Sequence, residues 1–287
     1  MKSYSLKLSI CIPTYNGADT ISETLESIFK QSYKNFEIVV SDDCSKDATE
    51  KVMKSFKDQR IRFFKNRKNI GYGDNLNTFK KRITGEVMIL MAQDDLLLKD
   101  ALLKIANGFL QDEDIGVVTR PFYQFEFDPK IPIRYWPPPS IKKDTIITIN
   151  SSKKLIEAAV AATYLVSCCA FRVKYIDTFF TSHVFTSQCY VFFSIFKKHK
   201  ILFLKDYVVA VRVYSSQCRF KPSIYRPSPV ATWNEVFNKV LSEKKYEQVR
   251  KICQNYTAQN YVGLVQIKNW ANTRYLIEEI FMHLKYR

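Results

Sequence analysis

Two pairs of adjacent carboxylates stand where buried strands are expected to end. Asp42 and Asp43 follow one apolar run, and Asp94 and Asp95 follow another. Ligands of open parallel sheets bind outside the carboxyl ends of the strands. Carboxylate oxygens in that position suit the polar groups of a nucleotide or a divalent cation such as Mg²⁺. Both pairs are therefore candidate ligand-binding residues.

The first pair closes a strand–helix–strand pattern. Apolar residues over 8–12 predict a buried strand that Pro13 ends, and those over 36–40 predict a second strand. Between the two strands, apolar residues recur at helical spacing at positions 21, 25, 28 and 29. The pattern predicts a nucleotide-binding βαβ unit.

Strands and helices continue to alternate along the chain. Apolar or aromatic runs predict strands over 60–64, 86–91, 115–119, 122–127, 145–149 and 164–172, and further strands over 200–213. Apolar stripes predict helices over 74–83, 98–109, 151–160 and 190–196. The proline-rich segment 129–139 predicts a flexible loop. This order of elements indicates an α/β protein.

Composition limits the classes of partner. The 287 residues carry a net charge of +16, which favours phosphate-bearing partners or an anionic membrane surface. We find no recognised nucleic-acid-binding motif, so nucleic acid is not an expected partner. No window is apolar enough to span a bilayer, and no signal peptide precedes the first strand, so a cytoplasmic protein is expected. The seven Cys show no metal-ligand spacing and are expected to be reduced.

Several segments together resemble the family 2 glycosyltransferases, the large GT-A group that transfers sugars from nucleotide-sugar donors. The resemblance rests on Pro13–Asn16, Leu25–Ile28, Gln31–Ile38 and Val40–Thr49. The last of these segments reads Asp-Asp-Cys-Ser, where the family usually has Asp-Asp-Gly-Ser, so Cys44 departs from the pattern.

The resemblance implies the GT-A fold, a Rossmann-like and mostly parallel sheet flanked by helices. It also implies that the strands over 200–213 pair with each other as closing strands of this fold. We expect this domain over 1–220, with a nucleotide-sugar-binding half over 1–120 and an acceptor half over 121–220. Residues 221–287 are expected to form a C-terminal helical extension, because basic residues there are interleaved with apolar helical stripes. These helices would cover the core, pair with another copy of the chain, or lie on an anionic membrane.

The resemblance also implies which residues hold the donor. The expected donor-binding residues are Pro13, Thr14, Tyr15, Asn16, Asp42, Arg67, Asn69 and Asp94. Of these, the loop after the first strand and Asp42 would hold the nucleoside, and the basic turn around Arg67 would face the phosphates or base. Each residue taken singly is also common in ordinary turns, where Asn, Asp and Ser hydrogen-bond the backbone.

A divalent cation, Mn²⁺ or Mg²⁺, is implied at the second carboxylate pair. It would stabilise the charge that develops on the leaving diphosphate. Relatives commonly have Asp-x-Asp-Asp here, and this chain has Ala92 at the first position, so the expected metal ligands are Asp94 and Asp95. The alternative is that one of them caps the following helix.

The catalytic base is where the chain departs furthest from its relatives. Inverting members usually carry Glu-Asp before a Lys-Lys turn, and this chain has Ser187 and Gln188 at those positions. The candidates that remain are His183 and Asp177. An unperturbed imidazole titrates near neutral pH, which suits proton abstraction. A lone His is, however, more often a structural or surface residue.

The resulting hypothesis is a hexosyltransferase that adds one sugar at a time. A Gln-x-x-Arg-Trp motif of processive members is absent. The acceptor would be a glycan or lipid-linked oligosaccharide of a surface polysaccharide, reached by a peripheral protein at the inner membrane face. The aromatic residues Tyr135 and Trp136 would either contact this acceptor or pack on the protein itself. An alternative is a weak or inactive nucleotide-sugar-binding relative that assists an active transferase.

Overall fold

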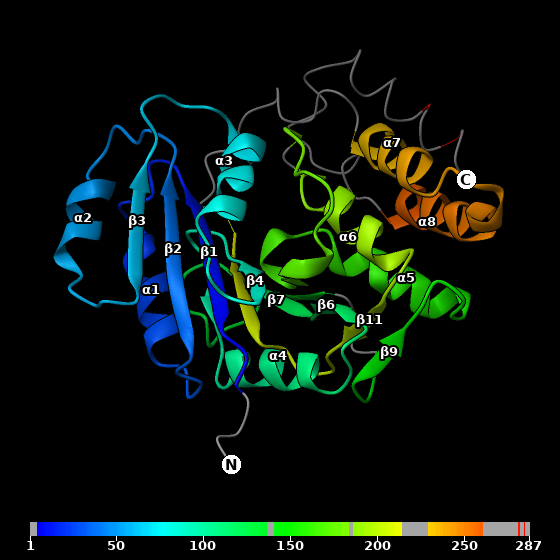
Figure 1. Cartoon of the computed structure of the whole chain (residues 1–287), viewed down its shortest axis with the longest axis horizontal. Coiled ribbons are helices and arrows are strands. Elements are labelled where there is room, and N and C mark those ends of the chain that lie inside the picture. Colours follow the sequence, from blue (N-terminus) through cyan, green and yellow to red (C-terminus); the bar gives the residue numbers. More distant parts are fainter. Residues whose placement is uncertain are drawn as a thin grey trace.

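The structure is a computed structural model that describes residues 5–136, 141–183, 186–213 and 229–260, with the single residues 281 and 284 (Figure 1). A central eight-stranded sheet has the strand order β3-β2-β1-β4-β10-β6-β11-β9. Its strands are β1 (Leu8–Thr14), β2 (Phe36–Asp42), β3 (Ile61–Lys65), β4 (Val87–Leu90), β6 (Ile115–Thr119), β9 (Thr145–Ile147), β10 (Cys169–Arg172) and β11 (Lys200–Phe203).

Four of these strands form the parallel half of the sheet. β1 pairs with β2 and β4, and β2 pairs with β3, all in parallel. Every residue of β1 and β2 is buried, as their near-continuous apolar sequences require. β10 then runs antiparallel between β4 and β6. The loops after β1, β2 and β4 consequently leave the sheet at the same edge, which we call the carboxyl edge.

Helices cover both faces of the central sheet. One face packs against α1 (Ile21–Phe29), α2 (Thr49–Ser55) and α4 (Ala101–Leu110). The other packs against α3 (Tyr72–Thr78), the 3-10 turn Phe79–Lys81, α5 (Lys153–Ala162) and α6 (Cys189–Phe196). Alternate residues of β1 enter the two cores, Ile10 on one face and Cys11 on the other. The predicted α/β fold, a sheet flanked by helices, is thereby confirmed.

A second, smaller sheet lies beside the carboxyl edge. Its order is β5-β12-β7-β8, formed by β5 (Leu96–Leu97), β12 (Val209–Arg212), β7 (Phe122–Phe125) and β8 (Arg134–Trp136). Two expectations were wrong here. β11 and β12 do not pair with each other but lie in different sheets. The proline-rich segment is not all loop, because β8 forms within it and pairs antiparallel with β7.

Two helices near the C-terminus complete the described structure. α7 (Pro229–Val240) packs on α6, and α8 (Glu247–Asn260) packs on α5 and α7 after the 3-10 turn Lys244–Tyr246. They bury Trp233, Phe237 and Cys253 in the same core as α6. Of the three roles expected for these helices, covering the core is the one that α7 and α8 perform. The apolar stripe over 276–284 lies almost wholly outside the described residues.

Other elements differ in extent from the sequence-based expectation. Residues 164–172 were expected to form one strand, but only β10 is extended, and Val166–Cys168 forms a 3-10 turn before it. The helix expected over 74–83 begins earlier and tightens into the 3-10 turn after Thr78. Across the described residues, no helix has both the length and the apolar character needed to cross a membrane.

Candidate active site

The carboxyl edge gathers three loops that are far apart in the sequence. β1 ends at Thr14 and pairs with β2 so that Thr14 lies opposite Asp42. β4 lies on the other side of β1 and leads into Asp94 and Asp95. Each carboxylate pair therefore flanks the loop after β1.

Asp42 is fully buried and only half of its carboxylate is used within the protein. Its Oδ1 accepts hydrogen bonds from the backbone N–H of Ser45, at 3.1 Å, and from the Ser45 hydroxyl. Its Oδ2 is buried and has no hydrogen-bond partner among the described residues. A buried acceptor without a donor is costly. Asp42 therefore fits a ligand that supplies a hydrogen-bond donor.

The loop after β1 is held in place by hydrogen bonds with the other two loops. Gln93 Oε1 accepts hydrogen bonds from the Thr14 hydroxyl and, at 2.9 Å, from the Tyr15 backbone N–H. Asn16 has a φ of 50°, and its Oδ1 accepts the Lys46 N–H at 2.8 Å. A Cβ at Gly17 would lie 2.5 Å from Gln93 Oε1, so any larger residue would displace the Gln93 side chain from these contacts. The Tyr15 ring remains 40% exposed beside this rigid backbone.

Asp43 positions the basic turn and does not face solvent. Its carboxylate accepts hydrogen bonds from Asn66 Nδ2 at 3.0 Å and from the N–H groups of Ile70 and Gly71 at 2.9 Å each. The turn that carries Arg67 and Asn69 is thereby attached to the end of β2.

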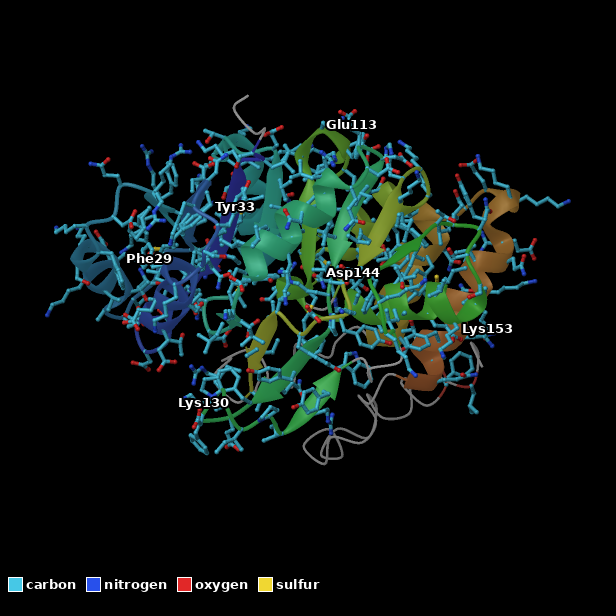
Figure 2. All side chains as sticks on the ribbon, turned by 90° about the horizontal axis from the view of Figure 1, so that it is seen from below. Phe29, Tyr33, Glu113, Lys130, Asp144 and Lys153 are labelled. Atoms are coloured by element: carbon cyan, nitrogen blue, oxygen red, sulfur yellow. The ribbon has the colours of Figure 1, made fainter. Side chains whose placement is uncertain are left out.

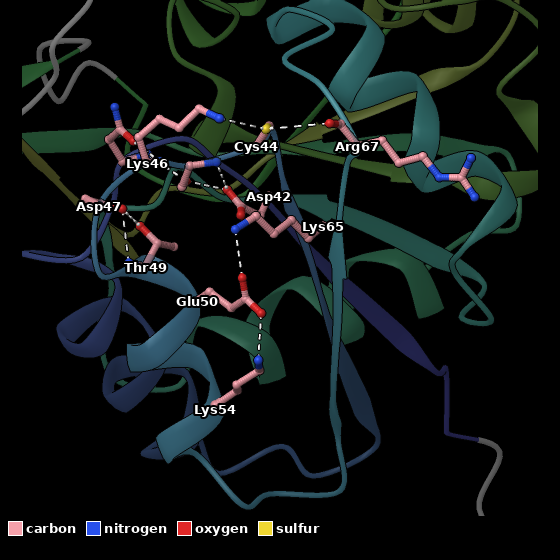
Figure 3. A network of polar contacts seen from close by, with 11 residues as sticks. Asp42, Cys44, Lys46, Asp47, Thr49, Glu50, Lys54, Lys65 and Arg67 are labelled. Carbon is pink, nitrogen blue, oxygen red and sulfur yellow. Dashed lines mark hydrogen bonds and ion pairs between the residues drawn. The ribbon is translucent and has the colours of Figure 1, made fainter.

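Arg67 and Asn69 are both exposed on this turn. Asn69 Oδ1 accepts the Gly71 N–H at 3.1 Å, which makes it a turn residue. Figure 3 shows the Arg67 guanidinium pointing away from Asp42. The structure thus brings the Arg67 backbone to the site, while its side chain would have to change rotamer to reach a donor bound there.

The second carboxylate pair divides into an inner and an outer residue. Asp95 accepts a hydrogen bond from the Ser167 hydroxyl at 2.6 Å on Oδ2 and one from the Arg212 N–H at 3.1 Å on Oδ1. The Asp94 side chain keeps slight exposure, and its carbonyl accepts Arg212 Nε at 3.3 Å. Neither residue caps α4, which begins at Ala101. The capping alternative is therefore wrong.

A buried cation lies behind this loop. Arg120 directly follows β6, is completely buried and donates from Nη2 to the Ser167 carbonyl. Burial lowers the pKa of its guanidinium, while the negative charges of neighbouring groups, Asp95 among them, act against this shift. Sequence reasoning missed Arg120, Gln93 and Ser167. Their only sequence signal was a polar residue directly after an apolar run, for Gln93 and Arg120, or within one, for Ser167.

The positions of the expected base are occupied by buried neutral residues. Ser187 donates to Gln188 Oε1 at 3.0 Å, and Gln188 Nε2 donates to the Thr163 carbonyl at 2.5 Å. Both side chains serve the packing of α6.

The structure does not bring Asp177 to the carboxyl edge. β10 runs antiparallel to β4, so the chain after Arg172 leaves at the opposite edge, where Asp177 pairs with Lys198 at 2.8 Å. Burial acts to raise the pKa of Asp177, but hydrogen bonds from Lys198 and Ser194 outweigh it, and the pKa is lowered. A carboxylate held ionised by a lysine is a weaker base, which speaks against this candidate.

His183 lies on the carboxyl side of the sheet. The backbone two residues before it contacts α3 so closely that a Cβ at Gly73 would lie 2.1 Å from the Thr181 carbonyl oxygen. The pKa of Glu235 in α7 is lowered, chiefly by Lys239 and in part by His183, which places the imidazole near α7.

Comparison with known proteins identifies the family. A family model described as glycosyl transferase family 2 matches residues 9–180, more than half of the chain. The chain belongs to this family. The resemblance read from the sequence is thereby confirmed, and with it the enzyme class, a glycosyltransferase.

Individual family 2 relatives match parts of the chain. An uncharacterized glycosyltransferase of Rickettsia conorii is 28% identical over 84% of this chain and 40% of its own length. A UDP-Glc:α-D-GlcNAc-diphosphoundecaprenol β-1,3-glucosyltransferase of Escherichia coli is 35% identical over 33% of this chain and 38% of its own length. This chain therefore spans less than half of either relative.

Solved structures share the fold across nearly the whole chain. The S. aureus TarS 1–349 structure in complex with UDP-GlcNAc has a TM-score of 0.74 at 18% identity, covering 98% of this chain and 81% of TarS 1–349. The mannosyltransferase PcManGT of Pyrobaculum calidifontis, in complex with GDP-Man and Mn²⁺, has a TM-score of 0.61 at 16% identity, covering 98% and 88%. These similarities confirm the GT-A fold.

Proposed function

We propose that this family 2 glycosyltransferase transfers one sugar from a nucleotide-diphosphate sugar to a lipid-linked or glycan acceptor in surface-glycan synthesis. The observation that carries the proposal is the unpaired, buried Oδ2 of Asp42 at the carboxyl edge. The proposal is supported by TarS, solved with UDP-GlcNAc, and by the E. coli relative, named for a diphosphoundecaprenol acceptor.

In this proposal the first two loops bind the nucleoside. Asp42 accepts a hydrogen bond from the base or ribose, and Tyr15 offers an exposed ring for stacking. Gln93 fixes the spacing between the loops after β1 and β4, because it is bonded to the backbone of the first and belongs to the second. The basic turn with Arg67 and Asn69 lies beside the phosphates, where a rotated Arg67 side chain would add positive charge.

The second carboxylate pair would supply some, but not all, of the ligands of a divalent metal. No cluster of three or more His, Cys, Asp and Glu side chains suited to a metal occurs among the described residues. Asp94 would ligate directly, whereas Asp95 already accepts two hydrogen bonds and orients the loop. Bound there together with diphosphate oxygens and water, Mn²⁺ or Mg²⁺ would act as a Lewis acid on the leaving group. Manganese in the PcManGT complex supports this assignment.

For an inverting reaction, we propose His183 as the group that takes the proton of the acceptor hydroxyl. It is on the carboxyl side of the sheet, whereas Asp177 is held at the other edge by Lys198. Distributive addition of single sugars is part of the proposal, and the absence of a Gln-x-x-Arg-Trp motif supports it.

A second function is favoured by specific substitutions in the chain. Ala92 replaces the first acidic residue of the family pattern, and Ser187 with Gln188 replaces the usual carboxylates. These changes would suit a protein that binds nucleotide-sugar but transfers poorly and assists an active transferase.

Two variants separate these possibilities. Asp42→Asn should weaken binding of a nucleoside diphosphate with or without Mn²⁺, by about 1.5–3 kcal/mol for a lost charged hydrogen bond. Asp94→Ala should remove only the gain in affinity that Mn²⁺ gives. Thermal shift measures both, because a ligand of the folded state raises its apparent stability. Unchanged binding in both variants would overturn the proposed site. Intact donor binding without metal-dependent donor hydrolysis would favour the non-catalytic function.

A further inference from the structure

The β7–β8 hairpin exposes an unusual amount of apolar surface. Phe127 is 84% exposed, Ile131 66%, Ile133 54% and Tyr135 50%. Figure 2 shows the hairpin projecting from the body of the molecule, with Lys130 at its turn. Scattered exposed apolar residues are normal, but several large ones in one short hairpin mark an interaction surface.

Aromatic side chains and purely apolar side chains lie at different levels of the hairpin. Tyr135 packs against Tyr123 at 5.9 Å and Tyr207 at 5.1 Å between ring centroids, which forms an aromatic layer at the base. Aliphatic and phenyl groups occupy the turn, at Phe127 and Ile131. Amphipathic aromatic rings favour the headgroup region of a membrane, and purely apolar side chains favour the acyl region beneath it.

Charge on and around the hairpin permits contact with an anionic membrane. The hairpin as a whole carries Glu126, Asp128, Lys130 and Arg134, whose charges cancel. The chain as a whole carries +16, which attracts it to anionic lipid. A soluble acidic protein partner would match this overall charge but not the apolar turn.

The hairpin is also attached to the carboxyl edge of the central sheet. β7 pairs with β12 so that Phe125 lies opposite Arg212, and the Arg212 guanidinium stacks over the Phe125 ring at 4.6 Å. The same Arg212 donates to the Asp94 carbonyl. A membrane held by the hairpin turn would thus lie beside the loop that carries Asp94.

We propose that the β7–β8 hairpin inserts its turn into an anionic lipid bilayer and so presents the carboxyl edge to acceptors at the membrane surface. Membrane insertion itself requires no sugar transfer. The inference therefore rests on the proposed function only for the reason why insertion would be useful to the protein. It assigns the membrane contact to a hairpin of the small sheet, and not to the C-terminal helices.

The test is sedimentation of the full chain with vesicles of phosphatidylethanolamine and phosphatidylglycerol. Phe127→Ser and Ile131→Ser should each weaken vesicle binding by on the order of tenfold. In Phe127→Trp the indole emission should shift to the blue on adding vesicles. The matched control is Leu110→Ser, an exposed apolar residue at the end of α4, which should bind as the wild type does.

Three outcomes would overturn the proposal. The first is unchanged vesicle binding in Phe127→Ser and Ile131→Ser. The second is loss of binding only in Phe281→Ser with Leu284→Ser, which would move the contact to the C-terminal segment. The third is a wild-type dimer that Phe127→Ser dissociates without any change in vesicle binding, because the hairpin would then join copies of the chain. Nucleoside-diphosphate binding should be normal in every hairpin variant, so failure here leaves the proposed donor site untouched.

Discussion

Cys44 occupies a backbone position where an L-residue is strained. Its φ is 65°, in the left-handed region, immediately after the carboxylate pair that ends β2. For a residue other than glycine this conformation costs roughly 1–2 kcal/mol. The thiol makes two weak contacts, donating to the Arg67 carbonyl at 3.8 Å and accepting from Lys46 Nζ at 3.5 Å (Figure 3). These contacts tie the loop after β2 to the basic turn and offset part of the strain.

Two substitutions of Cys44 should separate the effect of backbone strain on stability from the effect of the sulfur contacts. Cys44→Ala keeps a Cβ at positive φ and removes both sulfur contacts, whereas Cys44→Gly removes the contacts together with the strain. We expect the Gly variant to be more stable than the Ala variant by about 1 kcal/mol. The difference is measured as a shift of the urea unfolding midpoint, provided that m, the dependence of the unfolding free energy on urea concentration, is the same in both variants. Equal midpoints would mean that the left-handed backbone at this position is not strained.

His183 is the proposed acceptor of the proton from the acceptor hydroxyl, and turnover measurements test this role. His183→Ala should lower turnover at saturating acceptor by about 10²–10⁴ and leave donor binding unchanged, because only proton transfer is lost. Asp177→Ala is the control and should keep full turnover, since Asp177 pairs with Lys198 at the other edge. Wild-type turnover in His183→Ala would exclude it as the base.

At the scale of elements, Glu37 connects β2 to its neighbours through a buried carboxylate. Its Oε1 accepts hydrogen bonds from the Ser9 hydroxyl at 2.7 Å and the Thr84 N–H at 2.5 Å, and its Oε2 accepts Arg62 Nη1 at 3.0 Å. Burial acts to raise the pKa of Glu37, but these hydrogen bonds together outweigh it, and the pKa is lowered. The Glu37 side chain thus holds β1, β3 and the turn before β4 to β2.

Glu37→Gln should destabilise the fold in a pH-dependent way. The amide brings N–H donors towards groups that already donate, so we expect a loss of about 1–3 kcal/mol near neutral pH. A lowered folded-state pKa gives stability that is present above the unfolded value of about 4.3 and is lost as the pH falls through the folded value. The difference between wild type and variant should therefore shrink below about pH 4. A difference independent of pH would contradict the assigned cause.

The elements that sequence predicted well are those whose local pattern determines them. β1 and β2 have near-continuous apolar sequences that fit only a doubly covered strand, so their place and the loops after them could be predicted. β12 was predicted as a strand but given the wrong partner, because its neighbours β5 and β7 lie about a hundred residues earlier and no local pattern encodes pairing. β8 was missed because prolines surround it.

The same limit applies within the site. Asp42, Asp94 and Asp95 could be found because adjacent carboxylates after an apolar run are a local signal. The supporting contacts could not, since Gln93 reaches back to Tyr15 and Ser167 reaches back to Asp95 only in the folded chain. The distinction between Asp94 and Asp95, an outer and an inner carboxylate, likewise depends on partners that the sequence does not place.

At the scale of the whole molecule, the C-terminal helices are continuous with the core of the transferase domain. Phe237 of α7 packs edge-on against Phe193 of α6, with ring centroids 5.1 Å apart, and Trp233 contacts Tyr164 at 5.2 Å. All of these side chains belong to the core on the α5–α6 face. A boundary at 220/221 would expose this surface, so the helices are better regarded as part of one folding unit.

Phe237→Ala tests whether α7 and α8 unfold together with the rest of the domain. The side chain is fully buried, and truncating a buried Phe to Ala typically costs about 3–5 kcal/mol. If α7 shares one core with the sheet, the variant should unfold in a single transition at lower denaturant, with probes in both halves of the chain moving together. Lys239→Ala, on the exposed side of the same helix, should leave the midpoint nearly unchanged. Two separate transitions, with only the earlier one shifted by Phe237→Ala, would instead show that α7 and α8 form an independent domain.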